Sequence, residues 1–142
     1  MSVQKKSKPF FTEVELFEKI LADAGFIILK YYLGISKKEQ GNRLKDRETD
    51  TLKQWKISPI DMEAQKYWKD YSEARNEMLM RTNFKNALWY VVNVDKKKST
   101  HIALISHLLR QLEYQNKDKE LLVYDYKQVY PATPENIKDK LF

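Results

Sequence analysis

The chain has 142 residues, of which 42% are hydrophobic and 32% are charged. This size and composition are typical of one soluble, folded domain and exclude an intrinsically disordered chain. The net charge of +6 favours anionic partners such as nucleotides, polyphosphate, nucleic acid or an acidic membrane surface. Cysteine is absent, which excludes disulfides, thiolate nucleophiles and cysteine metal sites.

No segment of the sequence predicts export or membrane insertion. The lysine-bearing start of the chain runs from Phe10 and Phe11 straight into Thr12 and Glu13, without the apolar core of a signal peptide. The longest apolar run, residues 26–29, is far shorter than the roughly 20 residues that a membrane-spanning helix needs. We therefore expect a cytoplasmic protein with no membrane partner.

The first third of the chain predicts an arm, a helix and a strand. Residues 1–12 are polar and lysine-bearing, which is typical of a flexible arm, and a capping box at Thr12–Glu15 opens a helix that Gly25 ends. Residues 26–33 are β-branched and aromatic without alternation, as in a parallel strand covered on both faces. Lys30 interrupts this strand, and its side chain either faces a ligand near the strand's carboxyl end or reaches solvent.

Charged helices are predicted after this strand. Ser36 and Glu39 form a second capping box, which opens a helix to about Arg47. The run Ser58–Asp61 predicts the start of another helix, which continues to Met80. Taken alone, charged helices of this kind are more simply explained as solvated surface than as a binding site.

Four cations lie close together along these helices and the link between them. Arg43 and Arg47 are four residues apart and share one helix face, and Lys53 and Lys56 flank Trp55 directly before the next helix. Four cations near one indole indicate a site for an extended polyanion.

The remainder of the chain predicts a strand at 88–92, a helix capped by Ser99 or Thr100, and a terminal helix from Thr133. His107 is predicted to be structural, because no second histidine, cysteine or carboxylate cluster provides metal-ligand spacing. The order of elements predicts part of an α/β sheet. The inner face of the helix that contains His107 is predicted from its periodicity to be Ile102, Ile105, Leu109 and Leu112.

Motifs of several enzyme classes are absent from the sequence. The glycines, Gly25, Gly34 and Gly41, are isolated, so they cannot form the phosphate-cradling loop of a P-loop kinase. Serine nucleophile elbows, zincin helices and paired-carboxylate sites are also absent.

A set of sequence runs nevertheless carries a family resemblance. The runs are Tyr32–Gln40, Arg43–Arg47, Leu52–Asp61, Tyr67–Tyr71, Ala74–Arg75, Met78, Arg81–Thr82, Trp89–Val92 and His107–Leu109. In register over residues 13–114, they closely resemble the carboxyl-terminal half of the second family of polyphosphate kinases. The resemblance implies the C-terminal part of a P-loop kinase-like three-layer sheet, with a helical lid at residues 36–81 and a C-terminal extension at residues 115–142.

The resemblance also implies a chemistry. Members of this family transfer a phosphoryl group between polyphosphate and a nucleoside mono- or diphosphate, with Mg²⁺. Arg43, Arg47, Lys53 and Lys56 would bind polyphosphate under the lid, and Lys30 would add a cation at the mouth of the strand. Positioned positive charge neutralises the migrating group, and a closing lid excludes water.

The sequence departs from the family pattern in two ways. The family's nucleotide-binding half, with its phosphate loop and magnesium carboxylate, should precede residue 13, where only a dozen residues stand. In addition, five single positions carry a residue other than the one usual in the family, namely Thr51, Leu88, Lys96, His101 and Ala103. We therefore expect no complete catalytic or metal site in this chain and no activity when it is alone.

Several interpretations follow from these departures. The chain is either active with a complementary N-terminal half on another polypeptide or a remnant without activity, and its uncovered strand edges predict self-association. The alternatives are a non-catalytic module that binds polyphosphate or nucleic acid, and a helical interaction protein without affinity for anions.

Overall fold

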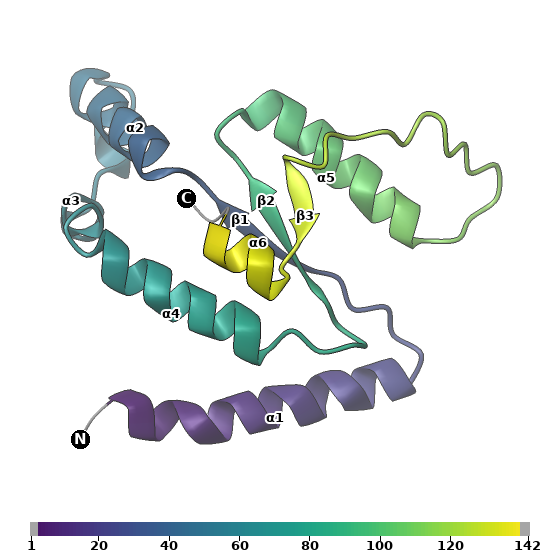
Figure 1. Ribbon diagram of the computed structural model, residues 1–142. Coiled ribbons are helices and arrows are strands. Elements are labelled where there is room, and N and C mark those ends of the chain that lie inside the picture. Colours follow the sequence, from purple (N-terminus) through teal and green to yellow (C-terminus); the bar gives the residue numbers. More distant parts are fainter. Residues whose placement is uncertain (1–2, 140–142) are drawn as a thin grey trace.

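The structure, a computed structural model, describes residues 3–139 and shows an α/β fold built on a three-stranded sheet (Figure 1). β1 (Lys30–Gly34) is parallel to β2 (Trp89–Asn93), and β2 is antiparallel to β3 (Val129–Pro131). The α/β class is as predicted. The helices are α1 (Val3–Asp23), α2 (Lys37–Thr49), α3 (Pro59–Ala64), α4 (Trp68–Arg81), α5 (Lys97–Gln111) and α6 (Pro134–Asp139), with a 3-10 turn, η1 (Gln54–Lys56), before α3.

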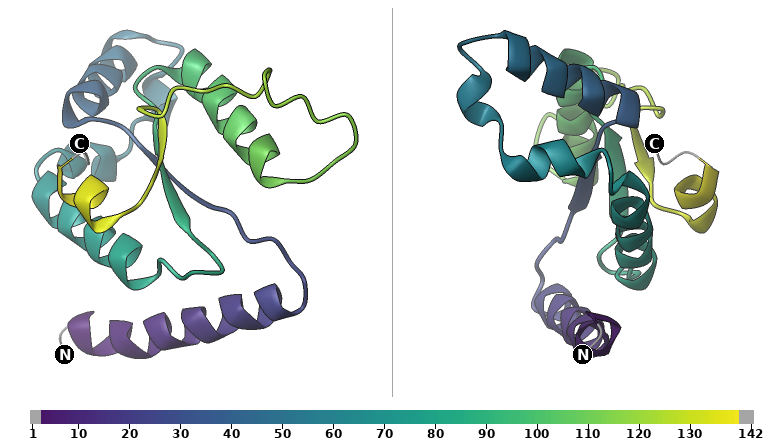
Figure 2. Two further views of the ribbon diagram at one scale, coloured as in Figure 1. Left: turned by 45° about the vertical axis from the view of Figure 1, so that its right-hand side comes forward. Right: turned by 90° about the vertical axis from the view of Figure 1, so that its left-hand side faces the viewer.

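Side chains of the strands alternate between the two faces of the sheet, and helices pack against the apolar side chains on both faces. On one face, Val92 packs against Ala103 of α5. On the other face, Val91 belongs to a buried cluster with Leu79 of α4 and Ile137 of α6. Figures 1 and 2 show the resulting layers, with α1 lying across the end of the sheet at which β1 and β2 begin.

The C-terminal residues are part of this core. The sequence predicts an extension at residues 115–142, but Val129 and Ile137 are 0% and 2% exposed, and Tyr130 packs in the same cluster as Leu79. The terminal helix is confirmed, with the Thr133 hydroxyl accepting a bond from the Asn136 amide at 3.2 Å. Residues 1–2 and 140–142 of the predicted arm and extension lie outside the described residues.

The first helix and strand differ from their predicted bounds. α1 begins at Val3, so residues 3–12 are helical rather than an arm. The guanidinium carbon of Arg81, in α4, lies 4.0 Å from the ring centroid of Phe11 and so connects α1 to α4. Gly25, with φ of 89°, ends the helical segment in the left-handed region as predicted. The strand begins only at Lys30, and of the apolar residues before it, Phe26 and Ile27 are 63% and 66% exposed.

The predicted helix from Pro59 to Met80 is broken into α3 and α4. Its start is confirmed, because Ser58 and Asp61 form the expected capping box and Pro59 occupies the first turn. The break follows Gln65, whose side-chain amide donates to the Lys37 carbonyl at 3.1 Å and so ties the end of α3 to α2. A contact across 28 residues has no signature in local periodicity.

The helix that contains His107 is rotated relative to the prediction. Thr100 is buried within α5 rather than capping it, and its hydroxyl donates to the Asn93 carbonyl at 2.7 Å. The small residues of α5 face the sheet, whereas Ile102 and Ile105 are 66% and 59% exposed. Small side chains allow close approach to the sheet, which apolar periodicity alone does not indicate. No helix in the part of the chain that the structure describes has the length and apolar character needed to cross a membrane.

Candidate functional site

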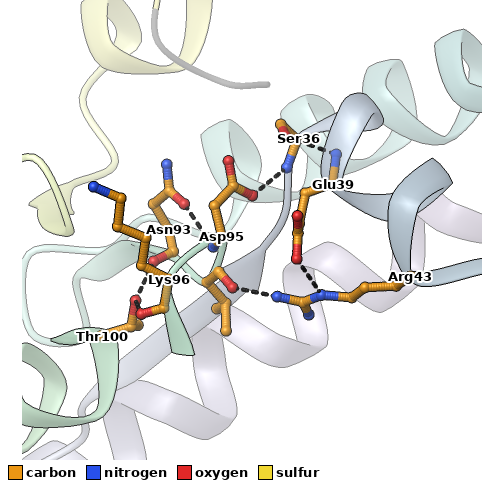
Figure 3. A network of polar contacts seen from close by, with 8 residues as sticks. Ser36, Glu39, Arg43, Asn93, Asp95, Lys96 and Thr100 are labelled. Carbon is orange, nitrogen blue, oxygen red and sulfur yellow. Dashed lines mark hydrogen bonds and ion pairs between the residues drawn. The ribbon is translucent and has the colours of Figure 1, made fainter. Parts of the chain in front are cut away.

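The candidate site lies where the parallel strands β1 and β2 end. Their exits are joined by two bonds: the Val94 amide donates to the Gly34 carbonyl at 2.8 Å, and the Ser36 amide donates to the Asp95 carboxylate at 2.8 Å (Figure 3). The Ser36 side chain caps α2 as predicted, by accepting from the Glu39 amide. The start of α2 is therefore attached to the loop that leads into α5.

Arg43 is the predicted cation nearest to this junction. Its Nε donates to Glu39 at 2.7 Å, and its Nη2 donates to the Val94 carbonyl at 2.5 Å (Figure 3). The side chain is 22% exposed. Because a guanidinium has five N–H donors, Arg43 can be held in place and still offer donors to an anion.

A hollow of about 520 Å³ opens beside Arg43. Its lining combines four cations with three carboxylates and a serine, namely Arg43, Lys96, Lys97, Lys98, Glu39, Asp46, Asp95 and Ser99. Lys97 begins α5, so the unpaired amides of the helix's first turn add positive potential here. The three lysines are not among the predicted site residues, although a run of lysines directly after a predicted strand is a sequence feature that indicates an anion site.

The predicted cations Arg47, Lys53 and Lys56 lie further along the chain and do not line this hollow. Arg47 Nη1 lies 3.6 Å from the Asp61 carboxylate, at the start of α3. Lys53 Nζ lies 2.7 Å from the Asp50 carboxylate. Arg47 and Lys53 therefore each have a carboxylate partner within residues 50–61, and the structure does not bring all four predicted cations into one cleft.

The pair of Lys53 and Asp50 is exposed and ionised at neutral pH. Its hydrogen bond lowers the pKa of Asp50 and raises the pKa of Lys53 from their ordinary values. Exposed pairs of this kind contribute little to stability, because water screens both charges. An incoming polyanion could therefore displace Asp50 from Lys53 at low cost.

Trp55 forms an exposed platform on this segment. Its indole ring is held by a bond from Nε1 to the Leu52 carbonyl at 2.9 Å, and the residue is 78% exposed. Lys56 Nζ lies 5.0 Å from the ring centroid, in a cation–π contact. The predicted association of the indole with a lysine is thus present in the structure.

Lys30 is placed differently from the other predicted cations. It begins β1 and so lies at the opposite end of the strand from Gly34 and α2. Its Nζ contacts the Glu18 carboxylate at 2.7 Å and the Thr82 carbonyl at 2.6 Å, and its side chain is 10% exposed. Lys30 therefore neither lies near the carboxyl end of the strand nor reaches solvent, and both predicted placements are wrong. Its partner Glu18 comes from α1, and local sequence gives no sign of that contact.

His107 has the structural role that the sequence predicts. It is 2% exposed, and its Nδ1 lies 2.7 Å from the Tyr31 hydroxyl. Among residues 3–139, no group of three or more histidine, cysteine, aspartate or glutamate side chains is placed to hold a metal ion.

Comparisons with known proteins agree on one family. The model of the family described as Polyphosphate kinase 2 matches residues 1–120. The chain is 46% identical over 105 residues to the ADP-polyphosphate phosphotransferase of Pseudomonas aeruginosa, a match that covers 74% of this chain and 34% of that protein. It is 38% identical over 110 residues to the GDP-polyphosphate phosphotransferase of Mycobacterium tuberculosis, covering 78% of this chain and 37% of that protein.

A solved structure shows the same likeness. The crystal structure of Polyphosphate Kinase 2 from Arthrobacter aurescens TC1 matches with a TM-score of 0.67 and 35% sequence identity, over 76% of this chain and 40% of that chain. The chain thus spans only 34% to 40% of the length of these three proteins.

Proposed function

This chain belongs to the polyphosphate kinase 2 family, and from that premise we propose that it carries the polyphosphate-binding part of a phosphotransferase. The complete activity is phosphoryl transfer between polyphosphate and a nucleoside mono- or diphosphate. The names of the relatives, which specify ADP in one case and GDP in another, support this substrate class. The cytoplasmic location that the sequence predicts stays a prediction.

The observation that supports the proposal best is the hollow beside Arg43. Two connections that are far apart in sequence, β1 to α2 and β2 to α5, bring Arg43 next to Lys96, Lys97 and Lys98. Four cations of this kind match a chain of phosphates, each of which carries negative charge.

The residues of this chain act by binding and orienting the phosphate chain. Segment 36–81 is the lid, and Arg47, Lys53 and Lys56 contact polyphosphate when it closes. Arg47 and Lys53 then exchange their carboxylate partners for phosphate oxygens. Arg43 stays attached to Val94 and aligns the phosphates at the strand ends. Their charge would stabilise the charge that develops on the migrating phosphoryl group.

Magnesium does not fit the residues described here. Of the three carboxylates at the hollow, Asp95 accepts from Ser36 and Glu39 accepts from Arg43, so only Asp46 is left to contact a cation there. The Mg²⁺ implied by the family resemblance therefore belongs to a part of the active protein outside these 142 residues, as does the loop that would hold the nucleotide. A complementary N-terminal half is the partner that would supply both.

Purified alone, the chain is expected to form no ATP or GTP from polyphosphate and ADP or GDP in the presence of Mg²⁺. The reason is that the lid cations bind a phosphate chain but cannot hold the nucleotide's phosphates. A coupled luciferase assay with the Pseudomonas aeruginosa relative as positive control measures this. Turnover above the no-protein blank that persists through an added purification step would contradict the expectation.

The lid assignment predicts a preference for polyphosphate. Replacing Arg43 and Arg47 together by alanine is expected to weaken polyphosphate binding about tenfold or more, because one charge-assisted hydrogen bond of ~1.5 kcal/mol corresponds to a factor of about ten. Isothermal titration with polyphosphate and with duplex DNA, each at two salt concentrations, measures the affinity and its salt dependence.

A matched control separates site from charge. Lys85→Ala with Lys119→Ala removes the same charge from exposed positions that do not line the hollow, and should leave polyphosphate binding within about twofold, a change of ~0.4 kcal/mol. Thermal unfolding of both double variants confirms that each is folded. Equal affinity for polyphosphate and DNA, with equal losses in the two double variants, would instead support the nucleic-acid or general polyanion module.

A further inference from the structure

A second, smaller hollow adjoins the one beside Arg43. It measures about 250 Å³ and lies between the exit of β2 and a turn near the C-terminus, with the lining residues Asn93, Asp95, Lys96, Asp125, Lys127 and Gln128. Asp95 and Lys96 line both hollows. Figure 3 shows the Lys96 side chain pointing away from Arg43. The two hollows are therefore neighbours on one surface, and Lys96 stands between them.

Gln128 attaches the C-terminal turn to both ends of the connection from β2 to α5. Its carbonyl accepts from the Asn93 amide at 2.8 Å, and its side-chain amide donates to the Ser99 hydroxyl at 2.6 Å. Within the turn, the Asp125 carboxylate accepts from the Lys127 amide at 2.8 Å, and the Asp125 carbonyl accepts from the Gln128 amide at 2.8 Å. The backbone that carries Lys127 is thus held in a defined place beside the site.

The cations of the smaller hollow are not paired with its carboxylates. In the part of the chain that the structure describes, neither Lys96 nor Lys127 takes part in an ion pair. The carboxylates of Asp95 and Asp125 accept from backbone amides instead. A phosphate chain therefore meets two ammonium groups here without having to displace a salt bridge first.

We propose that a long polyphosphate chain runs from the hollow beside Arg43 over Lys96 into the smaller hollow, where Lys127 binds it. This inference deepens the function proposed above and rests on it. The family match ends at residue 120, so the turn that carries Lys127 lies outside the part of the chain that resembles the family. A phosphate chain that occupies both hollows gains linked contacts, which strengthen binding beyond what one hollow provides.

The dependence of binding on chain length tests the role of Lys127. Triphosphate is expected to occupy the hollow beside Arg43, because that hollow has four cations. Lys127→Ala should therefore weaken the binding of a size-fractionated long polyphosphate about threefold or more, while the affinity for triphosphate stays within about 1.5-fold. Isothermal titration with both ligands measures the two affinities.

The salt dependence gives a second measure of the same contact. For the long polyphosphate, the slope of log affinity against log salt concentration should become shallower by about one in Lys127→Ala, because one phosphate contact fewer releases counterions. The slope for triphosphate should not change. Lys127→Arg keeps the charge and should restore the wild-type affinity and slope.

A matched control removes a lysine from the same connection after α5. Lys119 is exposed and lines neither hollow, so Lys119→Ala should leave the affinity for long polyphosphate within about 1.5-fold. Thermal unfolding verifies that the variants of both lysines are folded. In the wild type, the amide resonance of Lys127 should shift on addition of long polyphosphate and not on addition of triphosphate.

Three results would overturn the proposal. The first is an equal effect of Lys127→Ala and Lys119→Ala on long polyphosphate while the variant with Arg43→Ala and Arg47→Ala still binds it more weakly, in which case the proposed function stands and only this extension of the site fails. The second is a loss by the same factor for both chain lengths in Lys127→Ala, which indicates general electrostatic attraction. The third is a wild-type chain that binds neither ligand, which overturns the proposed function as well.

Discussion

Replacing Lys30 by alanine is expected to lower the free energy of unfolding by about 3 kcal/mol. The side chains of Lys30 and Glu18 are only 10% and 13% exposed, and removal of one partner of a largely buried ion pair leaves the other charge without compensation. The substitution also leaves the Thr82 carbonyl without its 2.6 Å bond and removes a cation that lies 5.1 Å from the ring centroid of Phe84. Urea unfolding followed by circular dichroism measures the change.

A compensated variant serves as the control for Lys30. Lys30→Met combined with Glu18→Leu removes both charges and keeps the volume, so it should recover most of the lost free energy of unfolding. Polyphosphate affinity of this double variant should equal that of the wild type. If it instead remained stable but bound polyphosphate much more weakly, Lys30 would be a phosphate ligand after all.

Replacing His107 by alanine is expected to cost about 3 kcal/mol of the free energy of unfolding, the range typical of truncating a large buried ring. The imidazole is 2% exposed, its centroid lies 4.2 Å from that of Tyr90 and 5.4 Å from that of Tyr124, and it bonds to Tyr31. Burial lowers the pKa of His107, which favours the neutral imidazole in the folded protein, and Nδ1 shares a 2.7 Å hydrogen bond with the Tyr31 hydroxyl. Burial likewise raises the pKa of Tyr31 to about 12.

These shifts predict the pH dependence of stability. A histidine whose folded pKa is below its ordinary 6.5 is protonated in the unfolded chain first, so its contribution is complete above pH 6.5 and falls as the pH drops towards the folded pKa. Unfolding free energies measured at pH 5 and pH 7.5 should therefore differ less in His107→Phe than in the wild type. The exposed His101→Phe variant should keep the wild-type difference, and an identical loss in both variants would argue against burial as the cause.

Three local signals in the sequence are confirmed, whereas the caps predicted at Thr12 and at Ser99 or Thr100 are not helix starts. The capping box at Ser58, the cap of α2 by Ser36 and the left-handed stop at Gly25 are all present, because each depends on contacts within a few residues along the chain. The family was identified from runs of residues spread over the chain, and the match to residues 1–120 shows that identification to be correct.

The candidate site was only partly visible in the sequence. Arg43 was predicted and does stand at the junction of the two strand exits, but its bond to Val94 spans 51 residues. The lysines that share its hollow, Lys96, Lys97 and Lys98, are adjacent in sequence to one another and far from Arg43. Which cations share a cavity depends on how strands pair, and spacing along one helix carries no information about that.

The amino-acid sequence by itself determined the α/β class, the starts of α2, α3 and α6, the family and the basic character of the segment from residue 36 to 81. Only the tertiary structure decided that Lys30 pairs with Glu18 and Thr82, that α5 turns its small residues inward, and that β1 is an open edge while the C-terminal residues complete the core. The physical reason is the separation along the chain between the residues that make contact. Caps and turns are set by neighbours within about one helical turn, whereas burial and charge pairing depend on segments that meet across tens of residues.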